Sequence, residues 1–144
     1  MQFSAFETYA AELGMAVAVT PEMQNSDYES GVAQLGDEMW HIRTARITPD
    51  QAGCFCRLLA AGLGRNDDAF SDDDPAAGLC VFVEQQGRRG GVFRFTGAHL
   101  AELGITSGRR PGKRGFRVYP SWCTGLNTQA TATQRAQASA FQEY

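Results

Sequence analysis

Hydrophobic and polar positions follow two different periods along this chain, and these periods predict both helices and strands. Apolar residues spaced three and four apart predict an amphipathic helix over residues 4–13. A second helix is predicted to begin at Thr48, the expected N-cap, and to carry an apolar stripe as far as Gly64. A third helix, rich in Ala, Gln and Thr, is expected from Asn127 to about residue 142.

Strands are predicted where apolar and polar residues alternate, or where short apolar runs end at turn residues. They fall at residues 31–35, 39–47, 78–86, 91–96 and 115–119. The first two are joined at Gly36-Asp37, the next two form a hairpin, and Thr96 can then cap a short helix over 97–103. Because these elements have no regular βαβ order, the sequence predicts a single α+β domain over residues 1–144. Its mixed sheet is expected to be mostly antiparallel and flanked by helices.

Composition is typical of a soluble globular protein, with 43% hydrophobic and 20% charged residues in a chain of 144. The longest apolar runs, such as Leu79 to Val83, are too short to span a membrane. The N-terminus shows no basic region ahead of an apolar core, as a secretory signal would require. We therefore expect a cytoplasmic protein without a membrane partner.

The four cysteines predict packed, reduced thiols rather than a metal site. Cys54 and Cys56 are two residues apart on the predicted second helix, so they are expected to point to different faces. Cys80 and Cys123 are far from both, and no second Cys or His pair stands at a spacing typical of zinc sites.

Charge is divided unevenly between the two parts of the chain. Residues 1–87 carry 14 acidic and 4 basic side chains, whereas residues 88–144 carry 2 acidic and 9 basic ones. Such segregation indicates a positive lobe that can meet a phosphate-rich partner. Alternatively, the two oppositely charged parts neutralise each other within the fold.

The basic lobe contains the strongest candidate for a binding site. Its cations are Arg109, Arg110, Lys113 and Arg114 in a Gly/Pro loop, followed by Arg117 on the predicted strand. Alternation along that strand places Phe116 and Val118 in the core and Arg117 and Tyr119 on the opposite face. The cations would bind phosphates, and Tyr119 and Trp122 would stack on planar groups. The pattern predicts binding of DNA, RNA or another phosphate-bearing ligand.

Arg43 and Arg46 form a second group of candidate phosphate-binding cations. They are three residues apart, so on a regular strand they face opposite ways. One is therefore expected to be exposed, and the other to pair with an acid. Glu29, Asp37 and Glu38 are the acids nearest in sequence.

Residues 112–122, with Leu126-Asn127, Gln129-Ala130, Thr133-Gln134 and Gln137 downstream, resemble the MepB-like family of small bacterial proteins. A looser match upstream includes the segment from Arg43 to Pro49, so the resemblance covers roughly residues 28–141. The family usually has Lys where this chain has Arg46, and Pro-Lys where it has Thr96-Gly97. The resemblance implies a fold remotely similar to PD-(D/E)XK nucleases.

That analogy makes a metal-dependent nuclease the alternative function. Nucleases of this type hold a divalent metal with an Asp and with an acid two residues before a Lys. The only lysine, Lys113, has Pro111 at that position. The nearest variant joins Asp74 to Glu84 and Gln86. Glu29, Asp37 and Glu38 are the other possible source of carboxylates, and such a site would require Mg²⁺ or Mn²⁺.

A third alternative is a regulatory or interaction protein that forms a homodimer. Its oppositely charged parts would pair across the subunit boundary, and the basic lobe would be buried.

Overall fold

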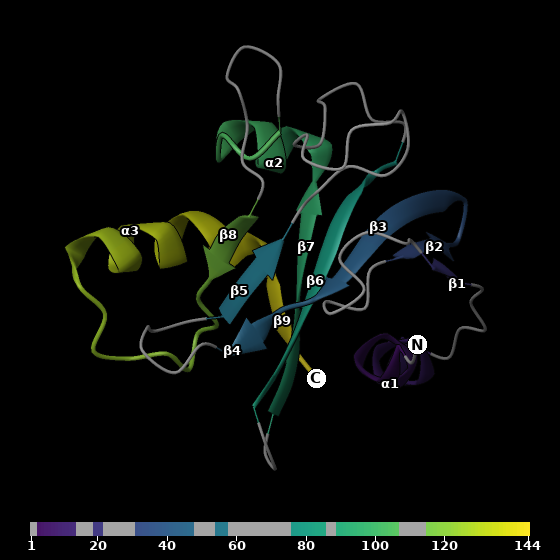
Figure 1. The fold of residues 1–144 in the computed structure, drawn as a ribbon, viewed down its shortest axis with the longest axis horizontal. Helices are drawn as coiled ribbons and strands as arrows, with labels where there is room; N and C mark the ends of the chain where they lie inside the picture. The colour runs from purple at the N-terminus through teal and green to yellow at the C-terminus, as the bar shows by residue number, and fades with distance from the viewer. Residues whose placement is uncertain are drawn as a thin grey trace.

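The computed structural model describes residues 3–13, 19–21, 31–47, 54–57 (backbone only), 76–85, 89–106 and 115–144. They form an α+β fold with a six-stranded and a three-stranded sheet (Figure 1). The elements are α1 (Ser4–Leu13), β1 (Val19–Pro21), β2 (Gly31–Leu35), β3 (Glu38–Thr44), β4 (Arg46–Ile47), β5 (Cys54–Arg57), β6 (Gly78–Gln85), β7 (Arg89–Thr96), α2 (Gly97–Glu102), β8 (Gly115–Val118), α3 (Thr128–Gln137), a 3₁₀ turn (Ala138–Ala140) and β9 (Phe141–Glu143). The α+β prediction is therefore confirmed.

The six-stranded sheet has the strand order β1-β2-β3-β6-β7-β9. All its neighbours pair antiparallel except β3 and β6, which are parallel. The predicted turn at Gly36-Asp37 and the hairpin of β6 and β7 are both present, and Gly36 adopts a φ of 63°, which glycine tolerates without steric cost. The sheet is thus mixed but mostly antiparallel, as predicted.

The predicted strand 39–47 divides between the two sheets. β3 ends at Thr44, the backbone N–H of Ala45 donates to the carbonyl of Phe82 at 2.9 Å, and β4 begins at Arg46. The three-stranded sheet has the order β4-β5-β8, and both of its pairings are antiparallel. One run of alternating sequence therefore serves both sheets.

The centre of the six-stranded sheet is buried on both faces. On β6, Leu79, Val81 and Val83 pack with Phe116 and Val118 of β8, whereas Cys80 and Phe82 pack with residues of α1. Figure 1 shows α1 on one side of the sheet and the three-stranded sheet with α3 on the other. A strand buried on both faces needs apolar residues at every position. This explains the continuous apolar run from Leu79 to Val83.

The predicted helix over residues 48–64 is wrong at residues 54–57, which form β5 between β4 and β8. The helix signals were local, whereas the strand is stabilised by pairing with segments distant in sequence, a contribution that intrinsic propensity does not contain. Positions 54 and 56 consequently fall on the same face of a strand rather than on different faces of a helix. The other residues of the predicted helix lie outside the described ranges.

The last predicted helix ends earlier than expected. α3 stops at Gln137, and Phe141–Glu143 form β9 on the edge of β7. Glycines allow the terminal rings to lie across β7, because a Cβ at Gly91 would stand 2.6 Å from the Phe141 ring and one at Gly90 would stand 3.0 Å from the Tyr144 ring. The short helix predicted after Thr96 is present as α2, with the Thr96 hydroxyl accepting the His99 N–H at 3.1 Å.

No helix among the described residues has both the length and the apolar character that crossing a membrane requires.

A polar cluster lies between α1 and the six-stranded sheet. The Arg94 guanidinium stands over the Trp40 ring at 5.0 Å and donates to the Tyr9 hydroxyl at 3.4 Å. Burial raises the pKa of the Cys80 thiol to about 12 and raises the pKa of Tyr9, with Arg94 opposing both shifts. Burial also raises the pKa of Tyr144, helped by the nearby charges of Glu84 and Tyr9. All three groups therefore stay protonated in the folded protein beyond their ordinary range.

Raised pKa values predict a loss of stability in alkali. Above the ordinary values of 9.0 for Cys and 10.0 for Tyr the unfolded chain releases protons that the folded chain retains. The stabilisation is thus complete below about pH 8 and declines as the pH rises toward the folded-state values. Urea unfolding should give a lower midpoint at pH 10 than at pH 8, and Tyr144→Phe should narrow this difference. An equal difference in the variant would contradict the assignment to Tyr144.

Candidate basic face

The three-stranded sheet carries a cross-strand row that contains two cations. Arg46 pairs with Phe55 on β5, and Phe55 pairs with Arg117 on β8. Directly paired positions share one face of a sheet, so these three positions form one row. Phe116 and Val118, on either side of Arg117, are buried in the core, as predicted. The row therefore lies on the outer face, turned away from the six-stranded sheet.

Arg57 extends this outer face by its register position. It pairs with Gly115, and it stands two residues from Phe55 on β5, so it falls on the same face. Arg57 is not among the predicted site residues, because residues 54–57 were expected to form a helix. The signal that could have found it is the alternation Cys-Phe-Cys-Arg, which also has the period of a strand. We call the positions of Arg46, Arg57 and Arg117 the cation row.

The described strands that carry the cation row contain no acidic residue. β4, β5, β8 and α3 contain no Asp or Glu, and the whole segment 103–142 lacks them. Like charges that share one face of a sheet repel one another. A bound anion would relieve that repulsion.

Side-chain amides of α3 fix the free edge of β8 and the connection that follows it. Gln137 is buried; its Nε2 donates to the Arg117 carbonyl at 2.8 Å, and its Oε1 accepts the Tyr119 N–H at 3.0 Å. This carboxamide takes the place of a neighbouring strand. Gln134 Nε2 donates to the carbonyls of Pro120 at 2.9 Å and Cys123 at 3.3 Å.

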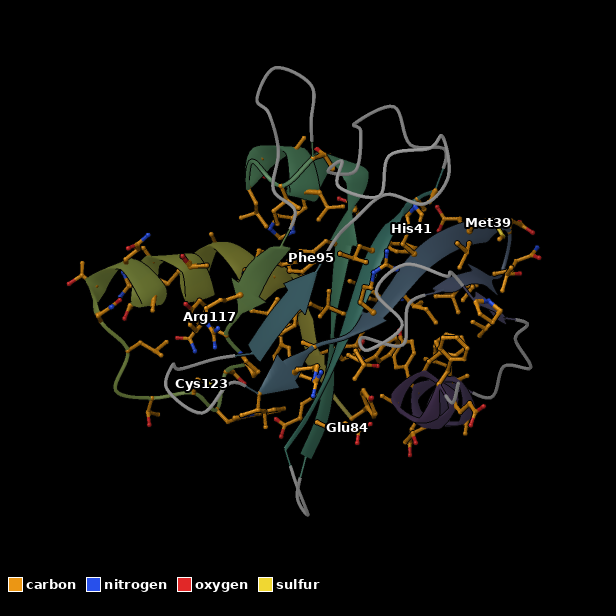
Figure 2. All side chains as sticks on the ribbon, in the orientation of Figure 1. Met39, His41, Glu84, Phe95, Arg117 and Cys123 are labelled. Carbon is orange, nitrogen blue, oxygen red and sulfur yellow. The ribbon has the colours of Figure 1, made fainter. Side chains whose placement is uncertain are left out.

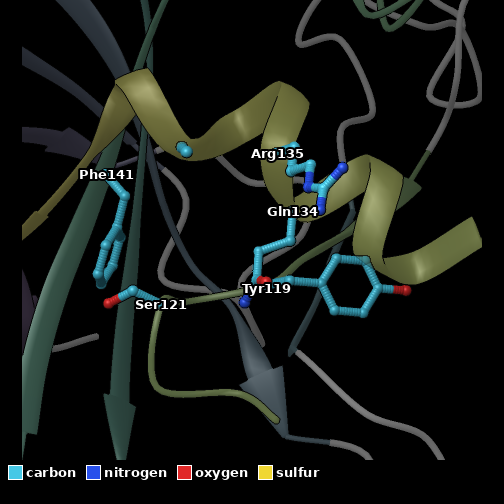
Figure 3. A pocket seen from close by; sticks show the side chains of 6 residues that line it. Tyr119, Ser121, Gln134, Arg135 and Phe141 are labelled. Carbon is cyan, nitrogen blue, oxygen red and sulfur yellow. The ribbon is translucent and has the colours of Figure 1, made fainter. Parts of the chain in front are cut away.

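A hollow lies between this connection and the C-terminal end of α3 (Figure 3). Its volume is about 210 Å³. The lining residues are Tyr119, Ser121, Gln134, Arg135, Ala138 and Phe141. The alternation of buried and half-buried residues along β8 continues through Pro120, so Tyr119 shares the outer face with Arg117. The hollow therefore adjoins the cation row.

Arg43 and Arg46 differ in exposure, as their spacing predicted. Arg46 is exposed, whereas Arg43 is fully buried and its Nη1 donates to the Ile42 carbonyl at 2.8 Å. A phosphate contact at the surface requires an exposed guanidinium, so Arg46 fits the basic face and Arg43 does not.

Among Glu29, Asp74, Glu84 and Gln86, the predicted catalytic or metal-site residues, Glu84 is the one that the described ranges include. Glu84 is exposed on β6, on the face that also carries Cys80 and Phe82, and Figure 2 shows it well away from Arg117. Within the described ranges, no three His, Cys, Asp or Glu side chains are grouped so that they could hold a metal ion. Several candidate residues lie outside these ranges, namely Glu29, Asp74, Gln86, Arg109, Arg110, Lys113 and Arg114.

Comparison with known proteins now identifies the family. The family model described as MepB-like matches residues 22–143. The chain belongs to the MepB-like family. A solved structure described as the crystal structure of MepB is 30% identical, covers 99% of this chain and 97% of its own, and gives a TM-score of 0.85. No curated protein matches the chain.

Several residues that carried the family resemblance have structural roles in this MepB-like fold. Asn127 caps α3 by accepting the Ala130 N–H at 2.8 Å, while Gln134 and Gln137 hold the segment after β8. Trp122 is half-buried and packs edge-on against Phe141, with ring centroids 5.5 Å apart. Its contact with Phe141 makes Trp122 part of the support for the hollow, and stacking of Trp122 on a ligand stays a prediction.

Replacement of Gln137 by Leu should destabilise the protein by about 2–4 kcal/mol, because it leaves the Arg117 carbonyl and the Tyr119 N–H without their partner. Urea unfolding measures the loss. Gln129→Leu, at an exposed position of the same helix, is the matched control and should change stability little. Equal effects of the two substitutions would show that Gln137 does not act as a substitute strand.

Proposed function

We propose that this MepB-like protein binds nucleic acid, or another ligand with several phosphates, on the outer face of its three-stranded sheet. The observation that carries the proposal is the register of β4, β5 and β8, which aligns Arg46, Phe55 and Arg117 in one row. Arginine guanidinium groups bind phosphate through paired, charge-assisted hydrogen bonds.

The spacing of the cation row suits a polyanion better than a single small anion. Arg46 and Arg117 are two strands apart, which corresponds to roughly 10 Å at the usual strand spacing of about 4.8 Å. A nucleic-acid backbone offers several phosphates in succession, so each cation can contact a different phosphate.

The sequence around the row supports the same proposal. Arg109, Arg110, Lys113 and Arg114 come directly before β8, and Arg135 of α3 lines the adjoining hollow. Together with the absence of acids from residues 103–142, these cations favour a partner of strong negative charge.

The described residues provide no specific support for the two alternatives predicted from the sequence, a nuclease and a homodimer. A Mg²⁺- or Mn²⁺-dependent nuclease requires a group of carboxylates that can hold the metal ion. Among the described residues, Glu84 does not belong to such a group. A homodimer requires a self-complementary surface, and no contact among the described residues supports one. Binding is therefore the function that we propose.

The double variant Arg46→Gln, Arg117→Gln should weaken binding of labelled single- and double-stranded DNA and RNA about tenfold or more at low salt. The magnitude of the slope of log affinity against log salt should decrease by about 1.8 for duplex DNA and by about 1.4 for single strands, since each lost phosphate contact removes about 0.9 and about 0.7, respectively. Fluorescence anisotropy at several salt concentrations measures both quantities.

The matched control is Gln34→Glu, Gln142→Glu, which lowers the net charge by the same amount at exposed positions of β2 and β9. It should retain most of the affinity. Equal weakening by the control would attribute binding to overall charge. No binding of the unaltered protein to any of the oligonucleotides at low salt would overturn the proposal.

A further inference from the structure

The hollow beside the cation row combines a ring, a cation and neutral hydrogen-bonding groups. Tyr119 and Phe141 supply aromatic surface, Arg135 supplies N–H donors, and Ser121 supplies a hydroxyl (Figure 3). Both hydrogen bonds of Gln134 use its Nε2, which leaves its Oε1 as an acceptor. Figure 3 shows the two rings on opposite sides of Gln134, so the hydrogen-bonding groups lie between them.

The size of the hollow limits what it can hold. Sites for drug-sized ligands range from about 300 to 1,000 Å³, and this hollow of about 210 Å³ is smaller. A single planar heteroaromatic ring, with donors and acceptors on its edge, fits both the volume and the chemistry. A nucleobase has this character, and aromatic side chains bind bases by stacking.

The walls are held in place before any ligand arrives. Gln137 fixes the Tyr119 backbone, Gln134 fixes the carbonyls of Pro120 and Cys123, and Phe141 belongs to β9 and packs edge-on with Trp122. A preformed hollow loses little conformational freedom when it is filled, and this favours binding.

We propose that the hollow holds one unpaired nucleobase of a single strand whose phosphates lie along the cation row. This inference rests on the proposed function. Tyr119 is two residues from Arg117 on the same face, about 7 Å along an extended chain. One single strand of nucleic acid can therefore contact Arg117 and Tyr119 together. A base that is stacked and paired in a duplex cannot enter such a hollow without being extruded. The site therefore selects single-stranded over double-stranded nucleic acid.

Ala138→Trp tests the proposal by filling the hollow without removing a cation. Ala138 lines the hollow and is exposed, so the larger side chain has room to be accommodated. The affinity for a labelled single strand should fall about tenfold, the order expected for the loss of one stacked base, and the affinity for a duplex should stay within twofold.

Ser139→Trp is the matched control, because Ser139 is the next residue, is exposed and does not line the hollow. It should bind both nucleic acids like the unaltered protein. Thermal unfolding of both variants should show equal stability. If only Ala138→Trp is unstable, Ser121→Leu replaces it as the filling variant, with the same expected loss.

A direct measurement separates this proposal from the proposed function. Adenosine or uridine 5′-monophosphate at millimolar concentration should shift the backbone amide NMR signals of Ser121, Gln134 and Arg135. The shifts should also appear in Ser139→Trp and be absent in Ala138→Trp.

Each other outcome would overturn at least one of the two proposals. Unchanged single-strand affinity in the stable filling variant, or an equal loss for single strands and duplexes, would overturn the nucleobase site and leave the basic face standing. Amide shifts with a monophosphate, but no oligonucleotide binding at low salt, would overturn the proposed function, and the hollow would then be a site for a free nucleotide and not for a base of a single strand.

Discussion

Burial of β6 and β7 on both faces is the constraint on which the rest of this structure depends. The hairpin carries apolar side chains on both sides, so each side must be covered by another layer. α1 covers one side, and the three-stranded sheet with α2 covers the other. Because β8 supplies Phe116 and Val118 to that core, alternation forces Arg117 to the outer face. The position of the cation row is thus a consequence of how the core is closed.

The small sheet is narrow, and its edge at β8 is completed by a side chain instead of a strand. An exposed strand edge offers unpaired N–H and C=O groups that can pair with another chain. The Gln137 carboxamide satisfies one of each, at Arg117 and Tyr119. The same carboxamide joins α3 to the strand, so it also helps to bring Arg135 and Phe141 to the hollow that Tyr119 lines. The buried side-chain amide of Gln137 therefore has two effects: it protects the edge of β8, and it helps to form the hollow.

The strands that carry the cation row contribute three arginines and no acidic residue. Electrostatic repulsion among the cations is a small cost to stability that the large apolar core can offset. The proposed binding of an anion would relieve this repulsion. The hollow next to the row adds a contact that depends on shape and stacking and not on charge. Together they would provide both affinity and selection between single strands and duplexes.

Local signals in the sequence predicted the elements that local interactions define. Alternation fixed which residues of β8 face the core, the Thr96 and Asn127 caps marked the starts of α2 and α3, and the apolar run from Leu79 to Val83 marked a buried strand. The basic and aromatic character of residues 109–122 was also evident from the sequence alone. These features depend on neighbours within a few residues, which the sequence states directly.

Only the tertiary structure decided the features that depend on distant partners. Residues 54–57 became a strand because β4 and β8 pair with it, β9 formed because the β7 edge was open, and Arg57 joined the cation row through its register with Gly115. Arg135 acquired a place beside Tyr119 because Gln137 ties α3 to β8. Pairing energy across a sheet depends on which strands meet, and that information lies in the closed fold and not in any short stretch of the chain.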